Sequence, residues 1–142
     1  MTNTTTATTT GGFTDEERDA MKERAQEVRG KKGDGLVELL AKIAEMEDAD
    51  RVMAERLHIL VGEAAPELTP KTWYGMPAYA KDGKVVLFFK PAAKFKARYA
   101  TLGFSDSAAL DDGAMWPTEF ALTSLTAADE KRILALVQRA TA

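Results

Sequence analysis

The side chains that could form a ligand site are concentrated in one short segment. It contains Lys71, Trp73, Tyr74, Met76 and Tyr79, grouped around a glycine and a proline. Pockets for small molecules are commonly apolar with a few convergent polar groups, and two phenol hydroxyls and one ammonium group are the polar anchors here. The segment therefore predicts a pocket wall. The structural alternative is a bulge or bend that directs the aromatic rings into the core.

Basic residues gather in the same region, although the whole chain has a net charge of −3. Residues 70–104 carry seven basic residues and one acid, whereas residues 1–69 carry nine basic residues and fifteen acids. Such a separation can attract anionic ligands to one face, and its structural alternative is a basic sheet edge that discourages aggregation. We expect Lys96 and Arg98, on one strand face with Lys94, to draw anions toward the aromatic segment.

The composition also excludes several kinds of chemistry. The chain has no cysteine, which excludes disulfides, thiolate metal sites and thiol nucleophiles. The single histidine, His58, excludes paired-histidine zinc motifs, and we interpret it as a hydrogen-bonded residue at the border of a helix face. We expect a non-catalytic protein, with an acid/base enzyme using Tyr74 or His58 as the weakest alternative. Nucleic-acid binding is not expected, because Phe95 and Tyr99 point away from the predicted basic face.

Carboxylates at helical spacing offer a second kind of site. Glu16, Asp19, Glu23 and Glu27 fall at positions i, i+3, i+7 and i+11, which places them along one helix face. Hard oxygen ligands of this kind suit weak, multi-site binding of iron or magnesium. The interspersed basic residues equally favour an ordinary solvated face. Iron binding at these four residues is therefore the alternative to the ligand pocket, for which no cofactor is expected.

The first half of the chain predicts a tail, a helix and a linker before the core. Thr14 and Glu17 have the spacing of a capping box, and the helix that follows has only a thin apolar stripe. Core helices are expected within 36–65, with Asp48 or Asp50 as an N-cap for the second. We divide the chain into a disordered Thr-rich tail (1–12), an accessory N-terminal helix (13–29), a flexible Gly/Lys linker (30–35) and an α+β domain (36–142).

Five strands are expected between these helices and a last helix at 127–140, which Thr126 should cap. Asp82-Gly83 is a strong signal for a two-residue hairpin turn. The run 85–89 is apolar on both faces, which predicts a central strand covered on both sides. A short helix is expected in the loop at 105–112. The strands are expected at about 72–74, 78–81, 84–90, 95–101 and 118–122. Together these elements predict an α+β fold, a mainly antiparallel twisted sheet of about five strands packed by helices.

The order of these elements and one motif resemble the bacterial YdhG-like family, a domain family of unknown function. The most specific part is Tyr74-Gly75-Met76-Pro77-Ala78-Tyr79, and further matches are Leu39 to Ile43, Ala64-Ala65-Pro66, Lys71 to Trp73 and Val85 to Phe89. The resemblance covers roughly residues 36–140 and implies an antiparallel sheet with helices on one face, similar to frataxin. At least one family member is described as an iron chaperone, so the resemblance implies iron handling by analogy. It implies no catalytic residues.

These observations predict a non-catalytic module that binds a small molecule or a protein partner. In one version of the hypothesis, the small molecule is anionic. The alternative is an intracellular iron chaperone acting through surface carboxylates. No apolar run is long enough to span a membrane, and the first ten residues resemble neither a signal nor a transit peptide, so we expect no membrane partner and a cytoplasmic location. If helix 14–29 does not cover the second face of the sheet, we expect that face either to be open or to form the interface of a homodimer.

Overall fold

The computed structural model describes residues 14–29 and 35–142. The predicted tail at 1–12 and most of the predicted linker lie outside these ranges. Within them, every peptide bond is trans, and no helix combines the length and apolar character needed to cross a bilayer. The helices are α2 (Asp15–Arg29), α3 (Gly35–Ala44), α4 (Asp48–Ala64) and α5 (Ala127–Ala140), and the strands are β1 (Thr69–Trp73), β2 (Met76–Lys81), β3 (Lys84–Lys90), β4 (Ala100–Phe104) and β5 (Glu119–Leu122).

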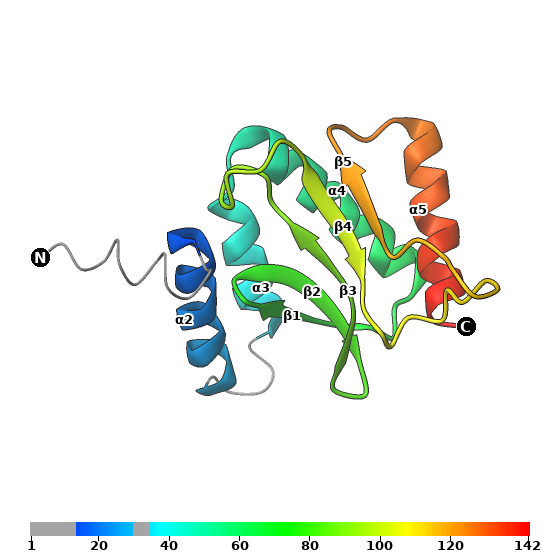
Figure 1. Ribbon diagram of the computed structural model, residues 1–142, viewed down its shortest axis with the longest axis horizontal. Helices are drawn as coiled ribbons and strands as arrows, with labels where there is room; N and C mark the ends of the chain where they lie inside the picture. Colours follow the sequence, from blue (N-terminus) through cyan, green and yellow to red (C-terminus); the bar gives the residue numbers. More distant parts are fainter. Residues whose placement is uncertain (1–13, 30–34) are drawn as a thin grey trace, which may run out of the picture.

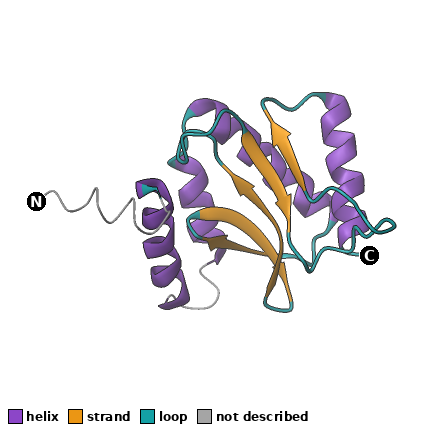
Figure 2. Ribbon diagram, in the orientation of Figure 1, coloured by secondary structure: helices purple, strands orange, loops and turns teal. Residues whose placement is uncertain are grey.

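The five strands form one antiparallel sheet in the order β1-β2-β3-β4-β5, so neighbours in sequence are also neighbours in space. β3 lies at the centre, as its continuous apolar run predicts. The expectation that both of its faces are covered is only partly met, because Phe88 and Lys90 on its second face are half-buried. Helices α3, α4 and α5 lie along one face of the sheet (Figure 1), and colouring by secondary structure separates the helical layer from the strands (Figure 2). The predicted α+β fold with a mainly antiparallel sheet is therefore confirmed.

Two tight turns, Tyr74-Gly75 and Asp82-Gly83, join β1 to β2 and β2 to β3. All four residues have positive φ, 54° and 76° in the first turn and 53° and 79° in the second. Positive φ at both central residues defines a type I′ turn, whose twist matches that of the flanking strands. The hairpin predicted at Asp82-Gly83 is confirmed. The bend expected around Gly75 is a second hairpin turn, in which Trp73 pairs with Met76.

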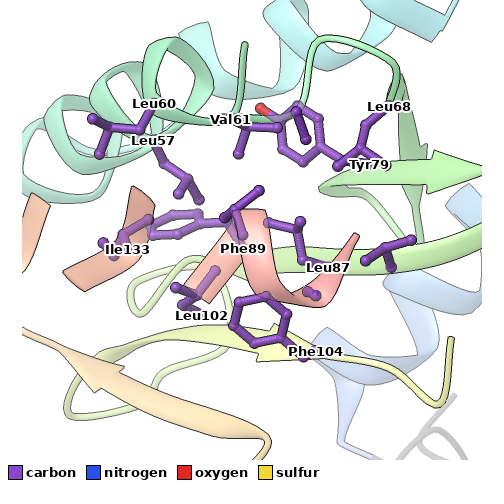
Figure 3. Close-up of a cluster of buried hydrophobic side chains, with 14 of the residues drawn as sticks. Leu57, Leu60, Val61, Leu68, Tyr79, Leu87, Phe89, Leu102, Phe104 and Ile133 are labelled. Carbon is purple, nitrogen blue, oxygen red and sulfur yellow. The ribbon is translucent and has the colours of Figure 1, made fainter. Parts of the chain in front are cut away.

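The side of the sheet that packs against α3, α4 and α5 is here called the covered face. The main core fills the space between this face and the three helices (Figure 3). Leu87 and Phe89 of β3 are fully buried there, and Leu102 of β4 is 1% exposed. The helices contribute side chains at helical spacing, namely Leu57, Leu60 and Val61 of α4 and Ile133 and Val137 of α5. Because apolar burial is the dominant favourable term in folding, this face accounts for most of the stability of the domain.

The strand expected at 95–101 is wrong in its first part. β4 begins only at Ala100, and Pro91 comes directly after the end of β3. The connecting residues form turns, in which the Lys96 N–H donates to the Ala93 carbonyl and Lys96 has a φ of 53°. Positive φ is incompatible with a strand. The alternation of basic and aromatic residues in this segment therefore does not create a dry and a wet strand face.

The helix expected at 105–112 is also wrong. This stretch is a loop with a single turn, in which the Ala108 N–H donates to the Ser105 carbonyl over 3.0 Å. The Ser105 hydroxyl donates instead to the Val85 carbonyl and ties the loop to β3. Ala108 and Leu110 are buried, so the loop is fixed to the core by apolar contacts rather than by helical hydrogen bonds.

Capping boxes form at both predicted positions. The Glu17 N–H donates to Thr14 Oγ1, and the Thr14 N–H donates to Glu17 Oε1, each over 3.0 Å. Thr126 and Asp129 make the equivalent pair of bonds at the start of α5. Each box satisfies two backbone N–H groups that have no partner inside the helix. The starts of α2 and α5 are thus determined by local sequence.

The expectation that Asp48 or Asp50 caps α4 is wrong. The N-cap residue is Glu47, and its side chain makes no capping hydrogen bond. Asp50 lies inside the helix and is only 4% exposed. Its carboxylate accepts a hydrogen bond from the Ala93 N–H over 2.9 Å, which attaches the β3–β4 loop to α4. Burying an acid in this way requires such a partner, so a long-range contact has replaced the expected local cap.

Candidate ligand pocket

The sheet face opposite α3, α4 and α5, here called the open face, is lined by alternate residues of each strand. Strand pairing places Phe88 opposite both Ala78 and Gly103, and Gly103 opposite Glu119. One pleat further along β3, Lys90 is opposite Thr101. Successive side chains of a strand point to opposite faces. Phe88 and Lys90 therefore project from the open face, whereas their neighbour Phe89 enters the main core.

Gly103 allows the Phe88 ring to lie across β4. A Cβ atom at this position would overlap with the tip of the Phe88 ring. The ring of Trp73 is next to it, with centroids 5.3 Å apart and planes tilted by 55°. Trp73 also meets Tyr74 edge to face at 5.1 Å. A continuous aromatic surface thus extends over the open face from the β1–β2 turn to β4.

Helix α2 stands beside α3 and the β1–β2 hairpin, at one end of the domain (Figure 1). It presents Glu17, Ala20 and Met21, which share one helical face because they are three and four residues apart. Ala20 is 4% exposed and Met21 is 45% exposed. The Arg24 guanidinium lies 5.8 Å from the centroid of the Tyr74 ring. The helix therefore covers only part of the open face.

A pocket of about 470 Å³ remains between α2 and the aromatic surface. This volume lies within the range of about 300–1,000 Å³ that is usual for small-molecule sites. Most of the lining is apolar, and these residues come from α2, the β1–β2 hairpin, β3 and the β3–β4 loop: Ala20, Met21, Trp73, Tyr74, Met76, Phe88 and Phe95. The pocket therefore offers flat hydrophobic surfaces to a ligand.

The polar lining consists of Glu17, Lys90, Thr101 and Glu119. Glu17 already accepts the capping hydrogen bond at the start of α2. The Lys90 ammonium lies 5.1 Å from the centroid of the Phe95 ring, and within the described residues it forms no ion pair. Its cross-strand partner Thr101 adds a hydroxyl beside it. Lys90 and Thr101 are thus available to a polar group of a ligand.

Three of the seven residues predicted as a ligand site meet in this pocket, namely Trp73, Tyr74 and Met76. Lys71 lies on the same face, opposite Ala78, but does not line the pocket. Tyr79 lies on the covered face, where it is 2% exposed in the main core. The segment is therefore divided between the two sides of the sheet, because β2 alternates its side chains.

Lys96 and Arg98, the predicted anion-attracting residues, lie in the exposed β3–β4 loop and do not line the pocket. The Lys96 ammonium is 2.8 Å from the Glu16 carboxylate of α2, and this hydrogen-bonded partner raises the pKa of Lys96. The Arg98 guanidinium lies 5.4 Å from the centroid of the Tyr99 ring. Lys90, rather than this pair, is the basic residue of the pocket.

Two of the four carboxylates of the metal alternative, Glu16 and Glu23, form ion pairs. Glu16 contacts Lys96, and Glu23 contacts Lys42 over 2.5 Å and Lys94 over 2.6 Å. Burial alone would raise the pKa of Glu23, but its hydrogen bonds to the two lysines outweigh burial and lower it. Among the residues described, no three acids or histidines are grouped closely enough to hold a metal ion. Asp19 is exposed, and the side chain of Glu27 lies outside the described part of the chain.

His58 is the half-buried border residue that the sequence indicates. Its Nδ1 is 2.9 Å from the Tyr79 hydroxyl, and the two rings stack with centroids 5.9 Å apart. Burial lowers the pKa of His58 and strongly raises that of Tyr79. Both shifts favour the neutral forms. The pair lies on the covered face, away from the pocket residues.

The half of the pocket that β3, β4 and β5 supply is not predicted by the sequence patterns. Phe88 belongs to the run 85–89, which predicts a covered strand, Lys90 ends that expected strand, and Thr101 and Glu119 are far away in sequence. One signal was present, since a glycine inside a strand, here Gly103, often marks a close approach of another group. The tight packing of the Phe88 ring over Gly103 fits this rule.

The chain matched no protein-family model, no curated protein and no solved structure. Its membership of the YdhG-like family therefore stays a prediction. The assignment of function rests on the geometry of the pocket.

Proposed function

We propose that the protein is a binding module for a small molecule with a flat, apolar body and one anionic group. The observation that carries this proposal is the pocket of about 470 Å³ lined by Trp73, Tyr74, Phe88 and Phe95. Aromatic rings offer large, rigid apolar surfaces at a low cost in conformational entropy. A planar ligand inserted between α2 and the open face would bury its body against these rings.

Lys90 supports the anionic part of the proposal. Among the described residues it is the only basic one that lines the pocket, and the other nearby lysines are engaged elsewhere, Lys94 with Glu23 and Lys96 with Glu16. Hydrogen bonds from a charged donor to a charged acceptor are stronger than neutral ones. A carboxylate held by Lys90 and by the Thr101 hydroxyl would fix the orientation of the ligand.

The proposal is tested by calorimetric titration of the protein with 2-naphthoate and with naphthalene-2-carboxamide, which has the same rings and no charge. We expect saturable binding of both, with the carboxylate roughly tenfold tighter, as a charged hydrogen bond predicts. Lys90→Gln should reduce this ratio to near one. Lys84→Gln, at the exposed opposite end of β3, is the matched control and should retain it.

Phe88→Ala should weaken both compounds by about tenfold or more, because it removes the centre of the aromatic surface. An absence of saturable binding by the wild-type protein, or binding that Phe88→Ala leaves intact, would contradict the proposal. Iron handling through surface carboxylates gains no support from the ion-paired arrangement of Glu16 and Glu23.

A further inference from the structure

We propose that Glu23 is a positioning residue of the pocket, which holds α2 in place as the wall opposite the aromatic surface. Ligand binding and the docking of α2 are then coupled, so each favours the other. This inference rests on the proposed function, because it concerns the regulation of the same pocket.

Glu23 joins two parts of the domain to α2 directly and a third through Lys94. One carboxylate oxygen accepts a hydrogen bond from Lys42 of α3 over 2.5 Å, and the other accepts one from Lys94 of the β3–β4 loop over 2.6 Å. The Lys94 ammonium also donates to the Gly75 carbonyl in the β1–β2 turn over 3.3 Å. The Glu23 side chain is 23% exposed, so water weakens these contacts less than at an open surface.

The β1–β2 turn is shaped to accept this arrangement. A Cβ atom at Gly75 would overlap with the carboxylate of Glu23 and the ammonium of Lys94. Gly83 occupies the same position in the second type I′ turn, where a Cβ would meet nothing within 4 Å. Both glycines have positive φ, 76° and 79°. The two turns therefore differ in whether a side chain can be added without disturbing α2.

Apolar burial contributes little to the docking of the part of α2 whose side chains are described, residues 15–24. In the part of the helix whose side chains are described, Ala20 is the only buried apolar residue, and Met21 remains 45% exposed. A third ion pair joins Glu16 to the exposed Lys96, and exposed pairs are worth little. Because α2 supplies Glu17, Ala20 and Met21 to the pocket, a loss of docking would remove one wall. The partly buried hydrogen bonds of Glu23 thus attach α2 to the rest of the domain.

By linkage, a ligand that contacts both the sheet and α2 stabilises the docked helix, and docking raises affinity by the same factor. Hydrogen exchange measures the docking, and calorimetry measures the affinity. The experiment compares the full-length wild-type protein with Glu23→Gln, and with Glu55→Gln on the exposed side of α4 as the control. Backbone amide exchange of α2 and α4 is followed without and with saturating 2-naphthoate.

We expect Glu23→Gln to speed the exchange of α2 amides about tenfold, as the loss of charged hydrogen bonds predicts, and to leave α4 unchanged. The affinity for 2-naphthoate should fall by a similar factor. In the wild-type protein, 2-naphthoate should slow exchange in α2, whereas high salt should speed it by screening the ion pairs. Glu55→Gln should behave as the wild type in every measurement.

A second pair of variants tests the same attachment without removing a charge. Gly75→Ala and Gly83→Ala each introduce a side chain at positive φ and carry a similar backbone cost. Only Gly75→Ala should speed α2 exchange and weaken 2-naphthoate, because only that Cβ displaces Glu23 and Lys94.

Unchanged α2 exchange in both Glu23→Gln and Gly75→Ala would overturn the positioning role, even where wild-type 2-naphthoate binding persists. If the wild-type protein does not bind 2-naphthoate, the proposed function and the coupling both fail, while the exchange data still show how α2 is held. Binding that leaves α2 exchange unchanged would overturn the coupling alone.

Discussion

The two faces of the sheet are stabilised in different ways. On the covered face, side chains from β2, β3, β4, α4 and α5 interlock with almost no exposure, and the His58–Tyr79 pair satisfies the polar groups at its border. On the open face, α2 is attached by ion pairs, with Ala20 as the only buried apolar residue among its described side chains, and a pocket remains beneath it. The comparison suggests that one face supplies stability and leaves the other free for binding.

The neighbours Phe88 and Phe89 provide the largest test of this difference. Phe89 is fully buried on the covered face, so Phe89→Ala should lower the free energy of unfolding by about 3–5 kcal/mol. Phe88 is half-buried on the open face, so Phe88→Ala should cost less than about 2 kcal/mol. Urea denaturation measures both values, and Phe89→Leu provides a milder change if Phe89→Ala does not fold. Equal losses for the two alanine variants would contradict the comparison.

A second test adds a methyl group beneath the aromatic surface. Gly103→Ala places a Cβ where the Phe88 ring now lies, and we expect a loss of about 1–3 kcal/mol as the ring is displaced. The displaced ring should also reduce the affinity for 2-naphthoate. Gly62→Ala is the control, because a Cβ in that part of α4 meets nothing within 4 Å. It should increase stability by roughly 0.5–1 kcal/mol through helix propensity and leave binding unchanged.

The two capping boxes distinguish a helix of the core from a helix of the pocket. Thr126→Ala should lower the global free energy of unfolding by about 1 kcal/mol, because α5 belongs to the main core. Thr14→Ala removes the same kind of bond from α2. It should speed amide exchange in α2 while leaving the denaturation midpoint nearly unchanged. A large drop in that midpoint for Thr14→Ala would show that α2 is part of the cooperative core.

The smallest expected effect concerns pH and the border of the covered face. Burial lowers the pKa of His58 below its ordinary value of 6.5, so the unfolded chain binds a proton more readily than the folded one. The stability of the wild type should therefore fall as pH decreases below about 6.5, until the folded-state pKa is passed. His58→Gln should remove this component of the pH dependence, measured as the melting temperature between pH 5 and pH 8. An identical pH profile in the variant would contradict the assigned environment.

Local patterns in the sequence predicted most of the fold. The capping boxes, the Asp82-Gly83 turn and the apolar run of β3 act over a few residues, and the structure contains all of them. The predictions failed where long-range contacts determine the local structure. Asp50 bonds to the β3–β4 loop instead of capping α4, and the segment before β4 turns although its residues alternate like a strand.

The candidate site was predictable only in part for the same reason. Trp73, Tyr74 and Met76 are close in sequence and were found, although the position of Tyr79 on the other face depends on the register of β2. Phe88, Lys90 and Glu119 join the pocket through strand pairing, which no local pattern specifies. The basic loop residues were expected to attract anions, but α2 supplies carboxylates to Lys94 and Lys96.

The two tryptophans of the chain allow the most direct test of the pocket. Trp73 lines it, whereas Trp116 packs against the main core. Their indole N–H signals can be followed separately in a ¹H–¹⁵N correlation spectrum during a titration with 2-naphthoate. We predict that the Trp73 signal shifts in a saturable manner and that the Trp116 signal stays in place. A titration in which neither signal moves, or in which only Trp116 responds, would contradict ligand binding on the open face.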